Sequence, residues 1–332
     1  MKSKIKVFWT AFIFIFLSGC GATTDFISHP ASSITSRQSD LYMVTLIMAA
    51  VIFVIVEGGI IISVTRFRRR KDDTSEPRQN HGNISLEIIW TAIPMVLVII
   101  LFVFTLNTMN AIAAPQPSPN DIKVNVVGHQ WWWEFNYPDL GITTANELFI
   151  PVDTPVQITL TSADVVHSFW IPQLAGKTDA VPGQVNHMWI NANHPGTFEG
   201  QCSEFCGIEH ALMRERVVSV SQADFQAWVT QQQSLPASPQ ADLEKQGQKL
   251  VADGVCAACH TINGTNAKAK IGPNLTHLFS RDTFAGASFP LTDANLTSWL
   301  KDNQTMKPGN LMAVNVPDTQ LGAILAYLKT LK

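Results

Sequence analysis

The sequence has few charged residues and few cysteines. Only 15% of its 332 residues are Asp, Glu, Lys or Arg, against about 25% in average soluble domains. Hydrophobic residues make up 46%, so the composition excludes intrinsic disorder, collagen and coiled coil. The formal net charge of −3 provides no basic field, and we expect no nucleic-acid partner. Five cysteines are too few for a disulfide scaffold, and the length predicts two or three unlike domains.

The first 19 residues have the pattern of a secretory signal. Three early lysines precede an apolar run from Val7 to Leu17, and small residues follow it. This order of charged, apolar and small residues is typical of exported proteins. The ending Leu17-Ser18-Gly19-Cys20 resembles a bacterial lipobox. We therefore expect 1–19 to be a lipoprotein signal peptide and Cys20 to be lipidated, with an uncleaved helix as the alternative.

Two apolar runs, 41–65 and 88–106, are expected to span a membrane as a hairpin within 20–112. The first reaches roughly 37 Å as a helix, against a hydrocarbon core of about 30 Å. The second tolerates Pro94, as spanning helices do. The basic cluster between the two runs should stay in the cytoplasm by the positive-inside rule. Everything after about residue 110 is then extracytoplasmic. Glu57 in the first run is equally compatible with a structural and a functional role.

A linker rich in proline ends the membrane region, and the texture of the sequence then changes. Between 120 and 232, short segments of alternating apolar and polar residues are separated by turn residues. Many short strands of this kind predict a β-sandwich or Greek-key barrel. The clearest expected strands are 122–127, 156–160 and 216–220.

Several metal-ligand side chains lie close together in this β region. Within twelve residues the sequence places Cys202, Cys206, His210 and Met213, and His167 precedes them in the same domain. Thiolate, imidazole and thioether donors favour copper, and the thioether argues against zinc. Two bridging thiolates with two terminal imidazoles would hold two coppers. The alternative is a structural disulfide between the two cysteines, which leaves the histidines and the methionine unexplained.

The stretch from about 20 to 230 resembles subunit II of the haem–copper cytochrome c oxidases. The resemblance rests on His167-Ser168, on the Lys-Thr-Asp-Ala-Val-Pro-Gly run at 177–183 and on 202–213. It implies a cupredoxin-like domain with a binuclear copper A centre. The implied ligands are two bridging cysteines, two terminal histidines and two weak axial groups: Cys202, Cys206, His167, His210, Met213 and the carbonyl of Glu204. The Glu204 side chain would also reach a magnesium ion shared with subunit I. The complete copper set argues against the quinol-oxidase branch.

The same resemblance covers two further motifs. In Gly-His-Gln-Trp-Trp-Trp at 128–133, Trp131 has the position implied to admit electrons from cytochrome c. Trp132 departs from the Tyr that is common in relatives. Without the resemblance, three adjacent tryptophans indicate strand packing with an exposed partner contact. In the segment 86–94, the resemblance places Glu87 near the mouth of a proton channel.

The last part of the chain, after a polar linker at 233–240, contains Cys256-Ala257-Ala258-Cys259-His260. Cys-x-x-Cys-His is the attachment pattern of c-type haem. The two thiols add to the vinyl groups of the haem, and the histidine binds its iron. On its own, Cys-x-x-Cys is also compatible with a redox dithiol or with half of a zinc site.

A methionine is expected as the second axial ligand of this haem. Met306 and Met312 compete for the role in the run Met-Lys-Pro-Gly-Asn-Leu-Met. In oxidases with a fused haem c domain, the similar pattern Lys-Pro-Gly-Asn-x-Met implies its last residue, here Met312. Apolar residues at helical spacing between 318 and 331 predict a terminal helix. We expect an all-α cytochrome c domain over 241–332.

Together these features predict an electron-transfer subunit of a terminal oxidase in the bacterial inner membrane, with its C-terminal domains in the periplasm. Electrons would pass from cytochrome c or another donor through one haem c and copper A to the dioxygen-reducing site of subunit I. Further membrane subunits and proton translocation belong to this prediction. The alternative within the enzyme class is a copper A nitric-oxide reductase. A copper chaperone or storage lipoprotein is disfavoured, because it needs no haem relay.

Overall fold

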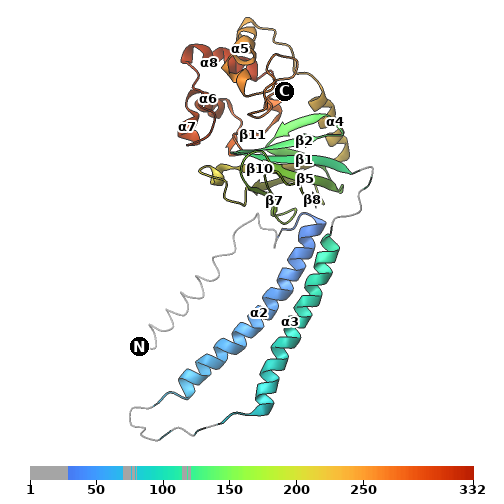
Figure 1. Ribbon diagram of the computed structural model, residues 1–332, viewed down its shortest axis with the longest axis vertical. Coiled ribbons are helices and arrows are strands. Elements are labelled where there is room, and N and C mark those ends of the chain that lie inside the picture. Colours follow the sequence, from blue (N-terminus) through green and yellow to red (C-terminus); the bar gives the residue numbers. More distant parts are fainter. Residues whose placement is uncertain (1–28, 70–75, 77–78, 80, 114–117, 119–120) are drawn as a thin grey trace. The chain divides into compact units, whose positions relative to one another are not determined.

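The computed structural model describes residues 29–69, 76, 79, 81–113, 118 and 121–332 (Figure 1). The chain divides into two compact units, one of Ser36–Ala113 and one that combines Met1–Thr35 with Ala114–Lys332. The expected signal peptide and the lipidation site at Cys20 lie outside the described residues, and so does most of the proline-rich linker.

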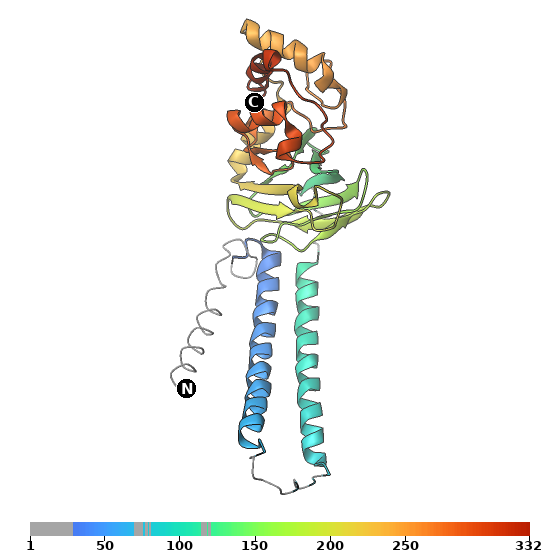
Figure 2. The same cartoon turned by 90° about the vertical axis from the view of Figure 1, so that its left-hand side faces the viewer.

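The smaller unit consists of two long apolar helices, α2 (Ser33–Arg66) and α3 (Ile84–Ile112). They contain the two expected spans, and each is long and apolar enough to cross a membrane. The side chain of Asn83 caps α3 by accepting hydrogen bonds from the first helical N–H groups, which a helix start leaves unsatisfied. Figures 1 and 2 show the two helices next to each other and running in opposite directions. The prediction of two apolar N-terminal helices is confirmed.

The residues that lead into α2 are tied to the β domain. The backbone of Ala31 bonds to Gln173 and Asn193, and the hydroxyl of Thr35 donates to the Gln173 carbonyl at 2.7 Å. Ser32 donates to the Leu174 carbonyl at 2.6 Å. These bonds tie residues 31–35 to the β domain.

The β domain is built from two main sheets with a core between them. Tyr137 on one sheet donates its hydroxyl proton to the carbonyl of Phe149 on the other at 2.8 Å. Inward residues alternate with half-exposed ones along the strands, as on β5, which is the pattern of a sheet with one covered face. The predicted β fold is confirmed.

The strands of the first sheet are, in spatial order, β3 (Ile142–Ala145), β2 (Trp132–Tyr137), β1 (Ile122–His129), β5 (Val156–Ser162) and β8 (Asn186–Ile190). The second sheet has the order β4 (Glu147–Pro151), β10 (Arg214–Val220) and β9 (Gly196–Gln201). Strands β6 (His167–Phe169) and β7 (Thr178–Ala180) form a separate two-stranded ribbon, which contacts the first sheet through β5 and β8. Parallel pairs join β1 to β5 and β4 to β10, and the other neighbours are antiparallel. Helix α4 (Gln222–Gln233) follows the last strand.

The C-terminal domain is mainly helical. Its helices are α5 (Asp242–Ala252), α6 (Asp293–Lys301), α7 (Asn303–Met306) and α8 (Asp318–Leu328). Helices α5 and α8 cross closely at Gly247, where an added Cβ would lie 1.9 Å from the Ala323 carbonyl oxygen. Tyr327, Trp299 and Leu331 belong to the buried core. The predicted helical cytochrome domain is confirmed, with one addition.

The addition is a short antiparallel ribbon of β11 (Thr283–Phe284) and β12 (Phe289–Pro290). Its turn has three successive residues with positive φ, Ala285, Gly286 and Ala287. That backbone region is rarely populated by residues other than glycine, so the sequence pattern gave little indication of this turn.

Candidate metal centres

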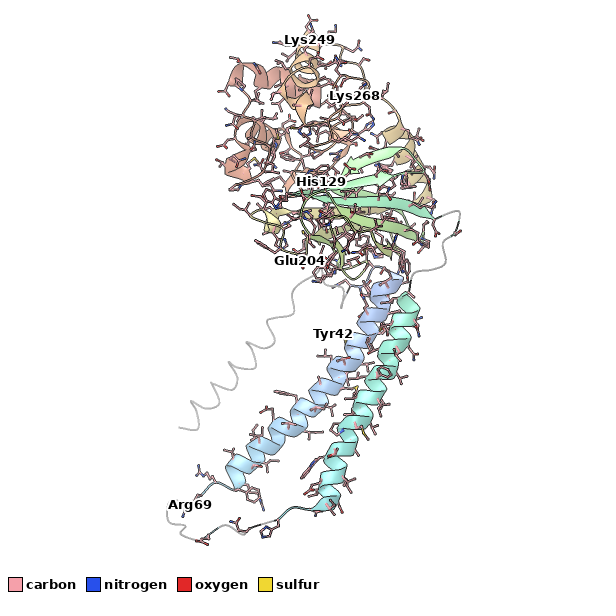
Figure 3. The ribbon with its side chains drawn as sticks, viewed as in Figure 1. Tyr42, Arg69, His129, Glu204, Lys249 and Lys268 are labelled. Atoms are coloured by element: carbon pink, nitrogen blue, oxygen red, sulfur yellow. The ribbon has the colours of Figure 1, made fainter. Side chains whose placement is uncertain are left out.

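The loop 202–213 connects two antiparallel strands of the second sheet, β9 and β10. The last residue of β9 pairs with the first residue of β10. Directly beyond this pair, the N–H of Cys202 donates to the carbonyl of Met213 at 2.9 Å. The two ends of the loop are therefore held together by backbone hydrogen bonds of the sheet. Figure 3 shows Glu204 on this part of the domain, and its side chain is exposed.

The ligand atoms predicted for copper come together in this loop. The sulfurs of Cys202 and Cys206 lie 3.8 Å apart. The ring nitrogen Nδ1 of His167 lies 3.9 Å from the first sulfur, and Nδ1 of His210 lies 3.6 Å from the second. The weaker donors are also close: Met213 Sδ lies 3.8 Å from Cys206 Sγ, and the carbonyl oxygen of Glu204 lies 3.3 Å from Cys202 Sγ. The ligand atoms of His167, Cys202 and Cys206 all lie within 4.8 Å of one another.

The two sulfurs are not joined, since a disulfide bond is about 2.05 Å long. Both cysteines have free, buried thiols. The hydrogen bond between them lowers the pKa of Cys202 and raises that of Cys206, so one of the two sulfurs readily becomes a thiolate. Thiolate is the form that binds metal. Two soft sulfur ligands with imidazole and thioether donors nearby fit a copper pair.

His167 is oriented by a carboxylate that sequence reasoning missed. Its Nε2 lies 2.8 Å from Asp164 Oδ1, which leaves Nδ1 directed at Cys202. Burial alone would raise the pKa of Asp164, but hydrogen bonds from His167 and from two backbone N–H groups lower it. The carboxylate therefore stays ionised and fixes the tautomer, as is usual for metal-binding histidines. The ring also needs the glycine at 128, where an added Cβ would lie 2.6 Å from His167 Cδ2.

The residues predicted to attach haem lie at the start of the helical domain. Cys256 falls in the short 3₁₀ turn Val255–Ala258, and Cys259 follows it. His260 Nδ1 lies 2.8 Å from the carbonyl oxygen of Pro273, so Nε2 is available to a metal. Burial lowers the pKa of His260, which favours the neutral imidazole that binds iron. The structure fits the expected haem at this position.

The loop with the expected methionine ligand is closed by an amide side chain. Asn310 Nδ2 donates to the carbonyl of Lys307 at 2.7 Å, and its Oδ1 accepts from the N–H of Met312 at 2.9 Å. The sulfur of Met312 accepts a hydrogen bond from Trp299 Nε1 at 3.2 Å. Met306 is the last residue of α7, and both methionines pack against the core. The choice of Met312 stays a prediction.

Trp131 lies next to the copper loop but is only 8% exposed. Its indole N–H donates to the carbonyl of Cys206 at 3.0 Å, and the Gln130 amide donates to the same oxygen at 2.7 Å. The neighbouring Trp132 stacks on His129, with ring centroids 4.2 Å apart. The tryptophan run is thus largely packed inside the domain.

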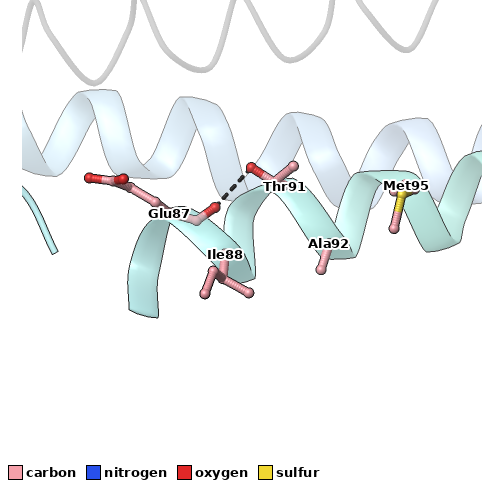
Figure 4. Close-up of a pocket in the computed structure, with 5 residues that line it drawn as sticks. All are labelled: Glu87, Ile88, Thr91, Ala92 and Met95. Atoms are coloured by element: carbon pink, nitrogen blue, oxygen red, sulfur yellow. Dashed lines mark hydrogen bonds between the residues drawn. The ribbon is translucent and has the colours of Figure 1, made fainter. Parts of the chain in front are cut away.

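Glu87 lies in the first turn of α3, in the other unit. It lines a shallow recess of about 390 Å³ together with Ile88, Thr91, Ala92 and Met95 (Figure 4). The hydroxyl of Thr91 donates to the backbone carbonyl of Glu87 at 2.8 Å. The carboxylate itself stays exposed at the helix start.

Three family models match consecutive parts of the chain. They are described as the transmembrane domain of cytochrome c oxidase subunit II, matching 23–108, the periplasmic domain of the same subunit, matching 141–220, and cytochrome c, matching 244–332.

Relatives match along most or all of the chain. A cytochrome c oxidase subunit 2 of Alkalihalophilus pseudofirmus is 35% identical and covers 100% of this chain and 98% of its own length. That of Bacillus subtilis is 34% identical, covering 97% of this chain and 96% of its own length. A quinol oxidase subunit 2 of Bacillus spizizenii is 33% identical, with 72% of this chain and 75% of its own length covered.

Proposed function

Because the chain belongs to the cytochrome c oxidase subunit II family and ends in a cytochrome c domain, we propose that it relays electrons from haem c to a binuclear copper A centre. As subunit II it works within a haem–copper oxidase complex, and we assign subunit I as the acceptor. The observation that carries the proposal is the meeting of two free thiols and two imidazoles in a chain that also has the haem c motif.

The β domain, called the copper domain from here on, has a site whose donor atoms are held in place by its own backbone and side chains. We propose that Cys202, Cys206, His167 and His210 would hold the two coppers, and that Met213 and the carbonyl of Glu204 would add weaker donors. The Glu204 carboxylate would bind magnesium at the contact with subunit I. When bound, a copper pair with shared thiolates takes up and releases one electron at a time. The chain's part is to hold these donors in place, and the sheet closure at Cys202 and Met213 does so.

The relatives include both cytochrome c and quinol oxidase subunits, so the electron donor has to be assigned from this chain. The complete set of copper donors and the haem c motif favour cytochrome c or a similar protein as donor. Trp131 is assigned to electron transfer within the chain, since its burial leaves little surface for an external protein. The donor would then dock on the haem domain.

The remaining assignments concern the membrane. The chain is a membrane protein with an extracytoplasmic part, and we assign it to the bacterial inner membrane with a lipidated Cys20. We assign Glu87 to the mouth of a proton channel, because its exposed carboxylate lies at the start of α3 beside a recess. Coupling to proton translocation forms part of this proposal.

The test is made on the isolated membrane complex. We expect two coppers and one haem c for each copy of this chain, a mixed-valence copper spectrum and oxygen uptake with ascorbate and a mediator. Cys206→Ser should abolish the copper spectrum while the haem c spectrum stays. A single copper or none in the unmodified complex would contradict the binuclear site, and nitric oxide reduction without oxygen uptake would contradict the oxidase.

A further inference from the structure

Lys307 belongs to the C-terminal helical domain, called the haem domain here, and its side chain is buried against backbone carbonyls of the copper domain. The side chain of Lys307 is 3% exposed. Its ammonium donates to the carbonyls of Trp131 at 3.1 Å and Leu212 at 3.0 Å, both in the copper domain. A third bond goes to the carbonyl of Ala285 in its own domain at 3.2 Å. An ammonium has three protons to donate, so all of them are used.

The charge of this lysine has a buried counterion in the copper domain. Glu209 Oε2 lies 3.7 Å from the Lys307 ammonium, and both side chains are almost fully buried. Burial lowers the pKa of Lys307 to about 8, while Glu209 opposes that shift. Removing one partner of a buried ion pair leaves an uncompensated charge, which is strongly destabilising. Loss of either side chain is therefore expected to weaken this boundary more than loss of one partner of an exposed ion pair would.

A second contact joins the same two regions. The turn between β11 and β12 reaches the copper domain, where the carbonyl of Gly286 accepts from the N–H of Arg214 at 2.9 Å. Ser288 donates its hydroxyl proton to the carbonyl of Leu212 at 2.6 Å. Leu212 and Arg214 are the two neighbours of Met213, the proposed axial ligand. The haem domain thus holds the backbone on both sides of that ligand.

The two contacts meet at Gly286. An added Cβ there would lie 2.9 Å from the Lys307 ammonium and 2.9 Å from the Trp131 carbonyl. With φ at +72°, the position also favours glycine for its backbone. Lys307, Trp131 and the turn are therefore in close contact, and no side chain separates them.

Lys307 also belongs to the loop that carries the expected haem ligand. Its carbonyl accepts from Asn310, whose other amide atom binds the N–H of Met312. Fixing the ammonium of Lys307 on the copper domain therefore fixes this loop as well. A further bond joins the two domains, since the side-chain amide of Gln232 in α4 donates to the hydroxyl of Ser280 at 3.2 Å.

We propose that Lys307 is a positioning residue that locks the haem-ligand loop onto the backbone around Trp131 and Met213. The haem domain is then a fixed block on the copper domain and not a carrier that swings on its linker. This inference rests on the proposed function, because the fixed geometry serves electron transfer between the two centres. Lys307 then supports both sites. Its backbone carbonyl holds the haem-ligand loop through Asn310, and its ammonium contacts the copper domain at the carbonyls of Trp131 and Leu212.

The first experiment compares Lys307→Met with the matched control Lys301→Met in the full complex. Lys301 is an exposed lysine of the same domain that pairs with Asp318. Amide hydrogen exchange at Arg214 reports docking directly, since that N–H donates to the carbonyl of Gly286 across the boundary. We expect exchange there to accelerate at least about tenfold in Lys307→Met, equal to about 1.4 kcal/mol, and to stay unchanged in the control.

The second readout is electron transfer from haem c to copper after a photoexcited ruthenium complex reduces the haem by one electron. In the unmodified complex the rate should not depend on solvent viscosity. In Lys307→Met, with copper and haem contents verified, the rate should fall roughly tenfold and become viscosity-dependent, because a freed domain must dock again. Unchanged exchange and an unchanged, viscosity-independent rate would overturn the proposal.

Ser288→Ala provides a milder variant should Lys307→Met fail to assemble. It removes one bond of the same boundary, and we expect faster exchange at Arg214 with both centres intact. Protection equal to the unmodified complex would count against the docked block. The proposed function fails in a different way: the copper would stay oxidised after haem reduction in the unmodified complex, whatever the exchange data show.

Discussion

The copper domain and the haem domain hold their ligand loops by different means. The copper loop is closed by backbone, through the Cys202 to Met213 bond at the end of two paired strands. The haem loop is held largely by amide side chains, those of Asn310, Gln304 and Asn303. A backbone closure survives substitution of the ligand residues, whereas an amide closure depends on the side chains that make it. The copper domain should therefore tolerate loss of a ligand better than the haem domain tolerates loss of a loop residue that binds no metal.

The largest effect is expected for the copper content of Cys206→Ser. This thiol lies near three other donors, and its loss removes one of the two sulfurs proposed to hold the copper pair. The copper content should fall to background. The circular dichroism and melting temperature of the metal-free protein should stay close to those of the unmodified metal-free protein, because the backbone closure of the loop is unchanged. The measurement is metal analysis with a melting curve. Collapse of the metal-free domain would show that the backbone closure is not sufficient.

An intermediate effect is expected for Asn310→Ala. The substitution removes a half-buried amide that joins Lys307 to Met312, at a cost of about 1–3 kcal/mol. We expect a lower melting temperature of the haem domain and a loss of the absorption band that reports methionine bound to haem iron. Asn295→Ala is the control, since that amide donates to Pro290 on the exposed surface. Equal effects of both substitutions would argue against a special role for Asn310.

The sequence was sufficient for the fold class, and it identified the sulfur and imidazole donors that the structure brings together in the loop 202–213. Alternating strands, apolar runs and the spacing Cys202-x₃-Cys206-x₃-His210 are local patterns, and local patterns can be recognised without a structure. The same holds for Cys-x-x-Cys-His. The β11–β12 ribbon was missed, because its turn uses positive φ at Ala285 and Ala287, where residue type gives no warning.

The residues that position the metal ligands could not be predicted from the sequence. Asp164 lies three residues before His167, which was the one available hint of its role. The pair of Lys307 and Glu209 joins positions that are far apart in the chain, and the pairing exists only because two domains pack together. A lysine in a Lys-Pro-Gly-Asn run is expected to be solvated. The burial of Lys307 depends on the packing of two domains, and no local pattern in the sequence indicates it.

Besides the pair of Lys307 and Glu209, the domain boundary contains another buried ionisable side chain, which comes from the copper domain. Glu147 of the copper domain accepts hydrogen bonds in the haem domain from the N–H of Thr283 at 2.8 Å, from its hydroxyl at 2.5 Å and from the N–H of Asp282 at 3.2 Å. Arg216 lies 3.8 Å away, and Arg281 and the Asp282 carboxylate also act on it. Each domain thus inserts one ionisable side chain into the other.

The smallest effect is expected from titration of Glu147. Burial raises its pKa above the ordinary 4.5, and the hydrogen bonds and Arg281 only partly offset this shift. The folded protein then keeps the proton at pH values where the unfolded chain has lost it, so stability falls as pH rises from 4.5 through the raised pKa. Glu147→Gln removes this slope, and Glu199→Gln, an exposed acid paired with Arg216, should retain it. Melting of the complex followed through haem c absorption measures both, and an identical slope in Glu147→Gln would mean that this carboxylate does not couple the two domains to pH.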